Sequence, residues 1–181
     1  MPKSLSLTNR PILDKAQCMQ RRFSVKVCRL TPALTRSTSE LIRQLISTLS
    51  YYNDRARREE SLKYVPAKLR AMTREDRDSV LLARYDKRTV GFCLSRYDDG
   101  VIWLSWFGVL QDWRGHGVGA KLLKALEKTV IARKCHKIWC DTRVSNHISQ
   151  LALRQAGYTR IAKLRYHWYG QDFYLWQKLI N

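Results

Sequence analysis

The chain of 181 residues is long enough for one domain that buries roughly 70% of its unfolded surface, and its formal net charge of +19 is extreme for such a domain. Its five cysteines form no Cys-x-x-Cys pair, which argues against zinc and thioredoxin-like sites and favours reduced cysteines in a cytoplasmic protein that binds no metal. No apolar run reaches the roughly 18 residues of a membrane span, so we expect no membrane partner.

The first 22 residues differ in character from the rest. They are polar and mildly basic, and they lack the apolar core of a secretory signal. We expect an N-terminal extension over 1–22, flexible or loosely docked, with a mitochondrial transit peptide as an open alternative. A single domain is expected over 23–181.

The first half of the domain mixes one strand with helices. Phe23–Leu30 alternates apolar and polar residues and predicts a strand. Ser37 or Thr38 is the expected cap of a helix that runs to about Leu49. A charged stretch, 53–60, is expected to be a solvated loop or a helix end. A weak second helix is expected over 61–72, interrupted by a proline.

The second half alternates between strand and helix patterns. The stretch from Val101 to Leu110 is apolar on both faces, as in a central strand. Helices are expected at Val118–Arg133 and Ile148–Gln155, and further strands at Ser79–Tyr85, Thr89–Tyr97, His136–Thr142, Thr159–His167 and Asp172–Leu179. On the central strand, Trp103 and Trp106 are expected to share one face, as packing or as walls of a pocket.

A glycine-rich run, Arg114-Gly115-His116-Gly117-Val118-Gly119, joins the central strand to the following helix. Glycines at alternate positions let a ligand approach the backbone closely. The amides at a helix N-terminus favour an anion, and Arg114 adds a positive charge. The run therefore predicts a pyrophosphate site.

The glycine spacing excludes two common nucleotide-binding loops. A Rossmann fingerprint needs Gly-x-Gly-x-x-Gly near the first strand and an acidic residue about 20 positions later. A Walker A loop needs a lysine followed by serine or threonine, whereas Leu122 follows Lys121 here. The remaining pattern is Arg-x-x-Gly-x-Gly.

That pattern, carried by Arg114, Gly117 and Gly119, resembles the acyl-CoA pyrophosphate loop of the GNAT family of N-acetyltransferases. Val109 before the loop and Asn146 in register with Gly157-Tyr158 also resemble the family. The resemblance implies an α/β (α+β) GNAT fold, with a mixed, mostly antiparallel sheet that is flanked by helices and splayed between strands four and five. It also implies acetyl-CoA as co-substrate.

By this resemblance, the cofactor would be held mainly by backbone groups. Phe107 and Val109 on strand four would pair with pantetheine, and Asn146 would contact the cofactor further along or would only cap a helix. Backbone amides would hold the pyrophosphate at Gly115, His116, Gly117, Val118, Gly119 and Ala120.

The catalytic residues match the family less well. Strand four carries no carboxylate to act as general base, and Leu153 stands at the position of the family's usual tyrosine acid. Asp141, Tyr158 and Tyr166 are the candidates for these roles, with Asp112 as a second possible base through water and His147 as a further substitute for the acid. Asp141 could equally be a structural partner for Arg143. Cys140 as an acyl-carrying nucleophile ranks lower, because no base is paired with it in the sequence.

The predicted function is acetyl transfer from acetyl-CoA to a primary amine by direct attack in a ternary complex. The acceptor is open: a peptide or aminoacyl α-amine, or a small amine. The alternative is a catalytically weak acyl-CoA sensor or a nucleic-acid-associated module. The charge fits RNA or another polyanion as partner, or a generic basic surface, and the chain would be a monomer or homodimer.

Overall fold

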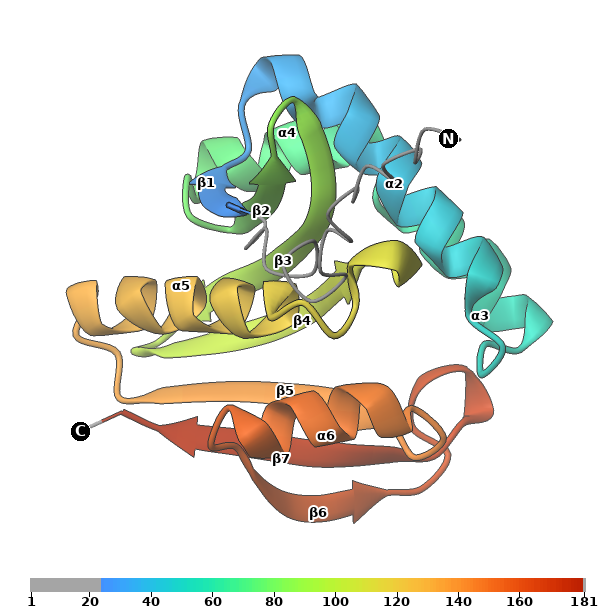
Figure 1. Ribbon diagram of the computed structural model, residues 1–181. Coiled ribbons are helices and arrows are strands. Elements are labelled where there is room, and N and C mark those ends of the chain that lie inside the picture. Colours follow the sequence, from blue (N-terminus) through green and yellow to red (C-terminus); the bar gives the residue numbers. More distant parts are fainter. Residues whose placement is uncertain (1–23, 181) are drawn as a thin grey trace, which may run out of the picture.

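The computed structural model describes residues 24–180 (Figure 1). The extension predicted over 1–22 lies outside the described residues, as do Phe23 and Cys18. The strands are β1 (Lys26–Arg29), β2 (Val80–Tyr85), β3 (Arg88–Asp98), β4 (Val101–Val109), β5 (Lys137–Arg143), β6 (Thr159–Leu164) and β7 (Phe173–Leu179). The helices are η1 (Pro32–Leu34), α2 (Thr35–Thr48), α3 (Asp54–Lys63), α4 (Pro66–Glu75), η2 (Gln111–Trp113), α5 (Val118–Ala132), α6 (His147–Gln155) and η3 (Trp168–Gly170).

The strands form one seven-stranded sheet in the order β1-β2-β3-β4-β5-β7-β6. β4 and β5 pair in parallel, and the other neighbouring pairs are antiparallel. The mixed, mostly antiparallel sheet predicted from the sequence is thereby confirmed.

The pairing between β4 and β5 is short. It joins Val101–Leu104 to Lys137–Cys140 and ends there, while both strands continue. Figure 1 shows β4 rising away from β5 beyond this point. The predicted splay between strands four and five is therefore present.

A β-bulge lies where the two strands part. Leu94 of β3 pairs with Trp106, but the next residue, Ser95, pairs with Leu104, so Ser105 is left over on β4. Because one extra residue reverses the alternation of side chains, Trp106 faces the same way as Trp103, three residues earlier. Both tryptophans line one cavity, as pocket walls, which is one of the two roles expected of them.

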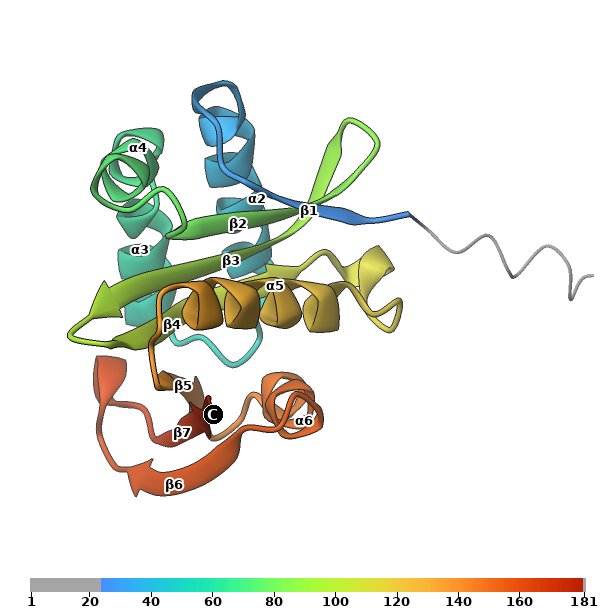
Figure 2. The ribbon, with the colours of Figure 1, turned by 90° about the vertical axis from the view of Figure 1, so that its left-hand side faces the viewer.

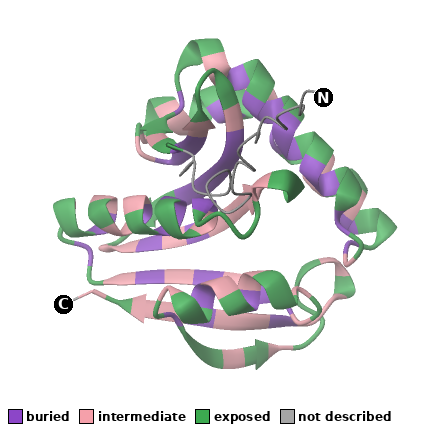
Figure 3. Ribbon diagram, in the orientation of Figure 1, coloured by how far each residue is buried: buried purple, intermediate pink, exposed green. Residues whose placement is uncertain are grey.

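The two faces of the sheet bury separate cores. On one face, α5 contributes Leu122, Leu123 and Leu126, which pack with residues of β4, β5 and β7. On the other, α2 contributes Ile42 and Ile46, which pack with residues of α3, α4 and β3. Figure 2 shows α3 and α4 on one side of the strands and α6 on the other, and Figure 3 shows β3 largely buried between the layers.

The predicted cap of the first helix is wrong. The chain makes a short 3₁₀ turn first, with a proline at its start, and α2 begins at Thr35 without a side-chain cap. The Ser37 hydroxyl instead donates to the Leu34 carbonyl at 3.1 Å, and Thr38 is buried within α2. Because Thr35 and Thr38 are buried, packing and not a side-chain cap holds the start of α2.

The charged stretch after α2 is a helix rather than a loop. Asn53 caps α3, and its Oδ1 accepts from the Ala56 amide at 2.9 Å. The Arg57 guanidinium donates to four carbonyls at and after the end of α2, those of Ile46, Ser47, Leu49 and Tyr52. A side chain that satisfies the orphaned end of the preceding helix explains why so polar a segment is ordered. Likewise, Pro66 does not interrupt one helix but starts α4 at its first turn.

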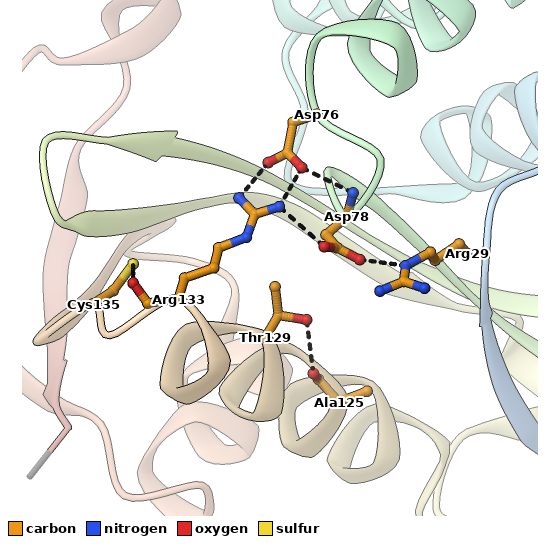
Figure 4. Close-up of polar contacts among 7 residues, drawn as sticks. All are labelled: Arg29, Asp76, Asp78, Ala125, Thr129, Arg133 and Cys135. Atoms are coloured by element: carbon orange, nitrogen blue, oxygen red, sulfur yellow. Dashed lines mark hydrogen bonds and ion pairs between the residues drawn. The ribbon is translucent and has the colours of Figure 1, made fainter.

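An ion cluster ties α5 to the edge of the sheet (Figure 4). Arg133, just after α5, donates to both Asp76 and Asp78 in the turn before β2, and Arg29 of β1 pairs with Asp78. The hydrogen bond from Arg133 lowers the pKa of Asp76. The cluster joins three segments distant in sequence at one end of the cavity.

Candidate active site

A cavity of about 1010 Å³ lies where β4 and β5 part. Its walls come from the splayed parts of β4 and β5, from α3 and α4, and from η3 between β6 and β7. The site therefore depends on segments from most of the described chain.

The glycine-rich run forms the N-terminal entry of α5. Gly115 and Gly117 have φ angles of +77° and +73°, which only glycine adopts without strain, and space is open where their Cβ atoms would be. The first amide bonded within the helix is that of Lys121, which donates to the Gly117 carbonyl. The amides of Val118, Gly119 and Ala120 thus have no intrahelical acceptor, as an anion site requires.

Arg114 connects this loop to the end of β4. Its Nε donates to the Val109 carbonyl at 3.1 Å, which holds the guanidinium at the strand terminus. His116 is exposed on the same loop. The positive charge of Arg114 is thereby held at the loop.

Phe107 and Val109 lie on the part of β4 beyond its last pair with β5. On the other edge they pair with Cys93 and Gly91 of β3. The edge that faces the gap has main-chain groups that an extended ligand can reach.

Asn146 caps α6 and also lines the cavity. Its Oδ1 accepts from the Ser149 amide at 3.2 Å, and its Nδ2 donates to the Ser149 hydroxyl at 2.9 Å. Both residues are cavity walls, so the capping role left open by the sequence is present and leaves the pair within reach of a ligand.

Leu153 and Cys140 form an apolar part of the wall. Leu153 is fully buried, so the position where the family's tyrosine was expected offers no proton. Burial raises the pKa of the Cys140 thiol well above its usual range. A neutral thiol is a poor nucleophile, which argues against an acyl-carrying role.

Two of the three predicted catalytic residues lie away from the cavity. Tyr158 is 4% exposed within the core beside α5, and burial raises the pKa of its hydroxyl. Tyr166 is 83% exposed in the turn after β6. Neither is among the residues that line the cavity, and His147, at the start of α6, is not among them either.

Asp141 is the predicted catalytic residue that lines the cavity. It follows directly after the last pair between β4 and β5, and its side chain is 12% exposed. Trp168 Nε1 donates to its Oδ2 at 2.8 Å, and His167 Nε2 lies 3.5 Å from the same oxygen. Burial raises the pKa of this carboxyl, and the hydrogen bond from Trp168 opposes the shift.

Glu60 of α3 lines the same cavity as Asp141, and no pattern in the sequence marked it as a site residue. Glu60 accepts from the Tyr169 hydroxyl at 2.8 Å, and Tyr64 stacks on Trp106 with ring centroids 5.7 Å apart. Burial raises the pKa of Tyr64, and the charges of Glu60 and Asp141 add to the shift. The residues come from separate segments, so only the tertiary fold brings them together.

Other kinds of site find no support in residues 24–180. No three His, Cys, Asp or Glu side chains in this range are grouped as metal ligands would be. Within the same range, no helix is both long and apolar enough to cross a membrane.

Comparisons with known proteins agree with this geometry. Residues 42–158 match the acetyltransferase (GNAT) family. An acetyltransferase of Pectobacterium atrosepticum is 37% identical over 71 residues, which are 39% of this chain and 50% of the relative. The aminoglycoside N(6')-acetyltransferase type 1 of Klebsiella aerogenes is 35% identical over 69 residues, 38% of this chain and 45% of the relative. The chain thus spans about half the length of the curated relatives it matches.

The fold is shared more widely than the sequence. The structure of yncA from Salmonella typhimurium, solved with acetyl-CoA, superposes with a TM-score of 0.71 at 17% identity, over 87% of this chain and 95% of that chain. With the family match over more than half of its residues, the chain belongs to the acetyltransferase (GNAT) family.

Proposed function

We propose that the chain is an acetyl-CoA-dependent N-acetyltransferase that acts on a primary amine by direct attack within a ternary complex. One observation carries the proposal: a single cavity joins the splayed edge of β4, which leads to the anion-binding loop, to the buried carboxylate of Asp141. Donor and acceptor could meet there without a covalent enzyme intermediate.

The residues present fit acetyl-CoA. The amides that open α5, with Arg114, would hold the pyrophosphate. Phe107 and Val109 would pair with pantetheine along β4, and Asn146 would contact it near α6. When bound, acetyl-CoA supplies an activated acyl thioester.

Asp141 would accept the proton of the attacking amine. The neutral amine nitrogen forms a bond to the acyl carbon while the carbon–sulfur bond breaks, the extra proton on the nitrogen passes to Asp141, and the leaving thiolate takes up a proton from solvent. A base must therefore remove one proton from the amine. The raised pKa of Asp141 brings it closer to that of an amine.

The absence of a carboxylate on β4 favours an amine of modest basicity. Deprotonation of a lysine with a pKa near ~10.4 costs about 4.6 kcal/mol at pH 7, whereas deprotonation of an α-amine with a pKa near ~8 costs only about 1.4 kcal/mol. We therefore propose an α-amine, and not a lysine ε-amine, as acceptor.

The test is thiol release from acetyl-CoA across pH, with matched α-amine and ε-amine acceptors. We expect turnover of the α-amine to exceed that of lysine at pH 7. Equal or better turnover of lysine would contradict the α-amine preference. CoA binding without thiol release on any amine would contradict the proposal that the chain is an N-acetyltransferase.

That last outcome would favour the second candidate, an acyl-CoA sensor or a nucleic-acid-associated module. The buried, apolar Leu153 supports it, because the usual acid is missing. Under that candidate the net charge of +19 would serve an RNA or other polyanionic partner.

A further inference from the structure

Arg143, the last residue of β5, is a buried cation in the wall of the cavity. It is 8% exposed. Its guanidinium carbon lies 3.8 Å from the ring centroid of Tyr52 and 5.0 Å from that of Phe173. Its Nε donates to Gln171 Oε1 at 2.8 Å. These contacts hold the guanidinium in one place.

No carboxylate of residues 24–180 lies within 4.0 Å of this guanidinium. Arg133, at the other end of the same cavity, is less buried and pairs with both Asp76 and Asp78. Burial of a charge without a direct ion pair is costly, and the aromatic faces and the more distant charge of Asp141 offset only part of that cost. The arrangement is that of a site for an anionic group.

Asp141 stands two residues before Arg143 on the same strand and so points to the same face. The two side chains place a carboxylate and a guanidinium on one wall, about 6.6 Å apart along the strand. Thr142 lies between them on the strand, and its hydroxyl accepts a hydrogen bond from Trp176, which is buried in the core beside α5. The opposite charges match a ligand that carries an ammonium and a carboxylate close together.

Two hydrogen bonds link distant segments at this end of the cavity. Gln171 Nε2 donates to the Tyr51 carbonyl at 2.9 Å, and Asn53 Nδ2 donates to the Tyr169 carbonyl at 3.0 Å. These bonds join the turn after α2 to the loop before β7, next to Arg143. They hold in place the segments that surround the guanidinium.

We propose that the acceptor is a free α-amino acid, whose carboxylate binds Arg143 while its amine faces Asp141. This inference rests on the proposed function and names the substrate class for the same site. The planar fork of arginine binds a carboxylate through two parallel hydrogen bonds, which lysine does not reproduce.

The first test varies the acceptor and leaves the protein unchanged. Full-length chain and acetyl-CoA are incubated with the common free L-amino acids, their α-amides and their decarboxylated amines, and thiol release is followed. We expect KM for the preferred free acid to be about 10- to 100-fold below that of its amide. Because the amide has the less basic amine, chemistry alone would favour the amide, so the comparison is biased against the proposal.

Equal or better turnover of the amides or decarboxylated amines would overturn the inference and leave the proposed function standing. Thiol release with no amine at all would overturn both.

The second test is Arg143→Gln, assayed with the same pairs. We expect KM for the free acid to rise about 10- to 100-fold, to the level of the amide, while the Kd for CoA stays unchanged. Arg143→Lys should restore only part of the difference. Arg88→Gln, which changes an exposed arginine outside the cavity wall, is the matched control and should have no effect.

A rise in the Kd for CoA with Arg143→Gln, at unchanged discrimination between acid and amide, would assign the guanidinium to the donor and overturn the inference. If Arg143→Gln does not fold, the acid–amide comparison on the unaltered chain decides.

Discussion

The proposed donor half and acceptor half of the site are built in different ways. The donor half follows one continuous stretch, from the splayed part of β4, which lines the cavity, to the loop and the start of α5, which lie beyond the cavity wall, and it offers mainly main-chain groups. The acceptor half uses side chains from α3, β5 and η3, which are separated by up to 109 residues in the contact between Glu60 and Tyr169. The donor half is thus a local motif, and the acceptor half is a product of the whole fold.

This difference predicts that substitutions in the donor half change the affinity for CoA, and that substitutions in the acceptor half change the rate of the reaction. The largest effect is expected from Asp141→Asn, which keeps the shape and the acceptor for Trp168 but removes the base. We expect kcat to fall about 100- to 1,000-fold, with the Kd for CoA unchanged. Steady-state kinetics and CoA titration check both numbers, and a fall below tenfold would exclude Asp141 as the base.

On the donor side, Arg114→Glu should weaken CoA binding about 10- to 100-fold while the fold is retained. The reversed charge repels the pyrophosphate, and the Val109 carbonyl loses the hydrogen bond that Arg114 donates to it. Calorimetric titration with CoA measures the loss. Arg88→Glu, an exposed charge reversal outside the cavity wall, is the control, and equal affinity in both variants would refute the loop assignment.

The ion cluster at the end of the cavity concerns stability rather than either substrate. Arg133→Met leaves Asp76 without its cation and Asp78 with Arg29 alone, and we expect a loss of about 1–3 kcal/mol in the free energy of unfolding at pH 7. Denaturant titration measures it. Lys134→Met, its exposed neighbour, should change stability by less than about 0.5 kcal/mol.

The same cluster gives a pH dependence with a definite sign. The pKa of Asp76 is lowered in the folded chain, so its stabilising effect is full above the unfolded pKa near 3.8 and is lost as pH falls through the lower folded value. Stability of the unaltered chain should therefore drop below about pH 4, and Arg133→Met should show a smaller drop. Parallel pH profiles of the two proteins would contradict this account.

The smallest effect concerns the acid side of the rate profile. Because burial raises the pKa of Asp141, its carboxylate is protonated at a higher pH than usual, and kcat/KM, expressed per concentration of neutral amine, should decline on acidification. Asp141→Asn should lack this limb. A limb that persists in the variant would assign it to another group.

The elements that the sequence predicts most closely belong to the donor half. The helix expected at Val118–Arg133 is observed at Val118–Ala132, and the strand expected at Val101–Leu110 is observed at Val101–Val109, because both have strong local periodicity. The splay also follows from the resemblance of the loop and its neighbours.

The acceptor half could not be predicted from the sequence, because its side chains come from segments that only the tertiary fold brings together. The stretch 53–60 is too polar for its pattern to predict a packed helix, and its order depends on Arg57 and the end of α2. Nothing local marks Glu60, His167 or Arg143, since each gains its role from partners far along the chain. By contrast, Tyr158 and Tyr166 matched in residue type but lie outside the cavity.

The most direct measurement of the central claim is a pair of titrations on Asp141→Asn and Arg114→Glu, each giving the Kd for CoA and the kcat at saturating acetyl-CoA. We predict that Asp141→Asn keeps its affinity and loses kcat, while Arg114→Glu loses affinity and keeps kcat. If both variants lose both quantities together, or if neither changes, one cavity with a donor half and a separate acceptor half is not how this chain works.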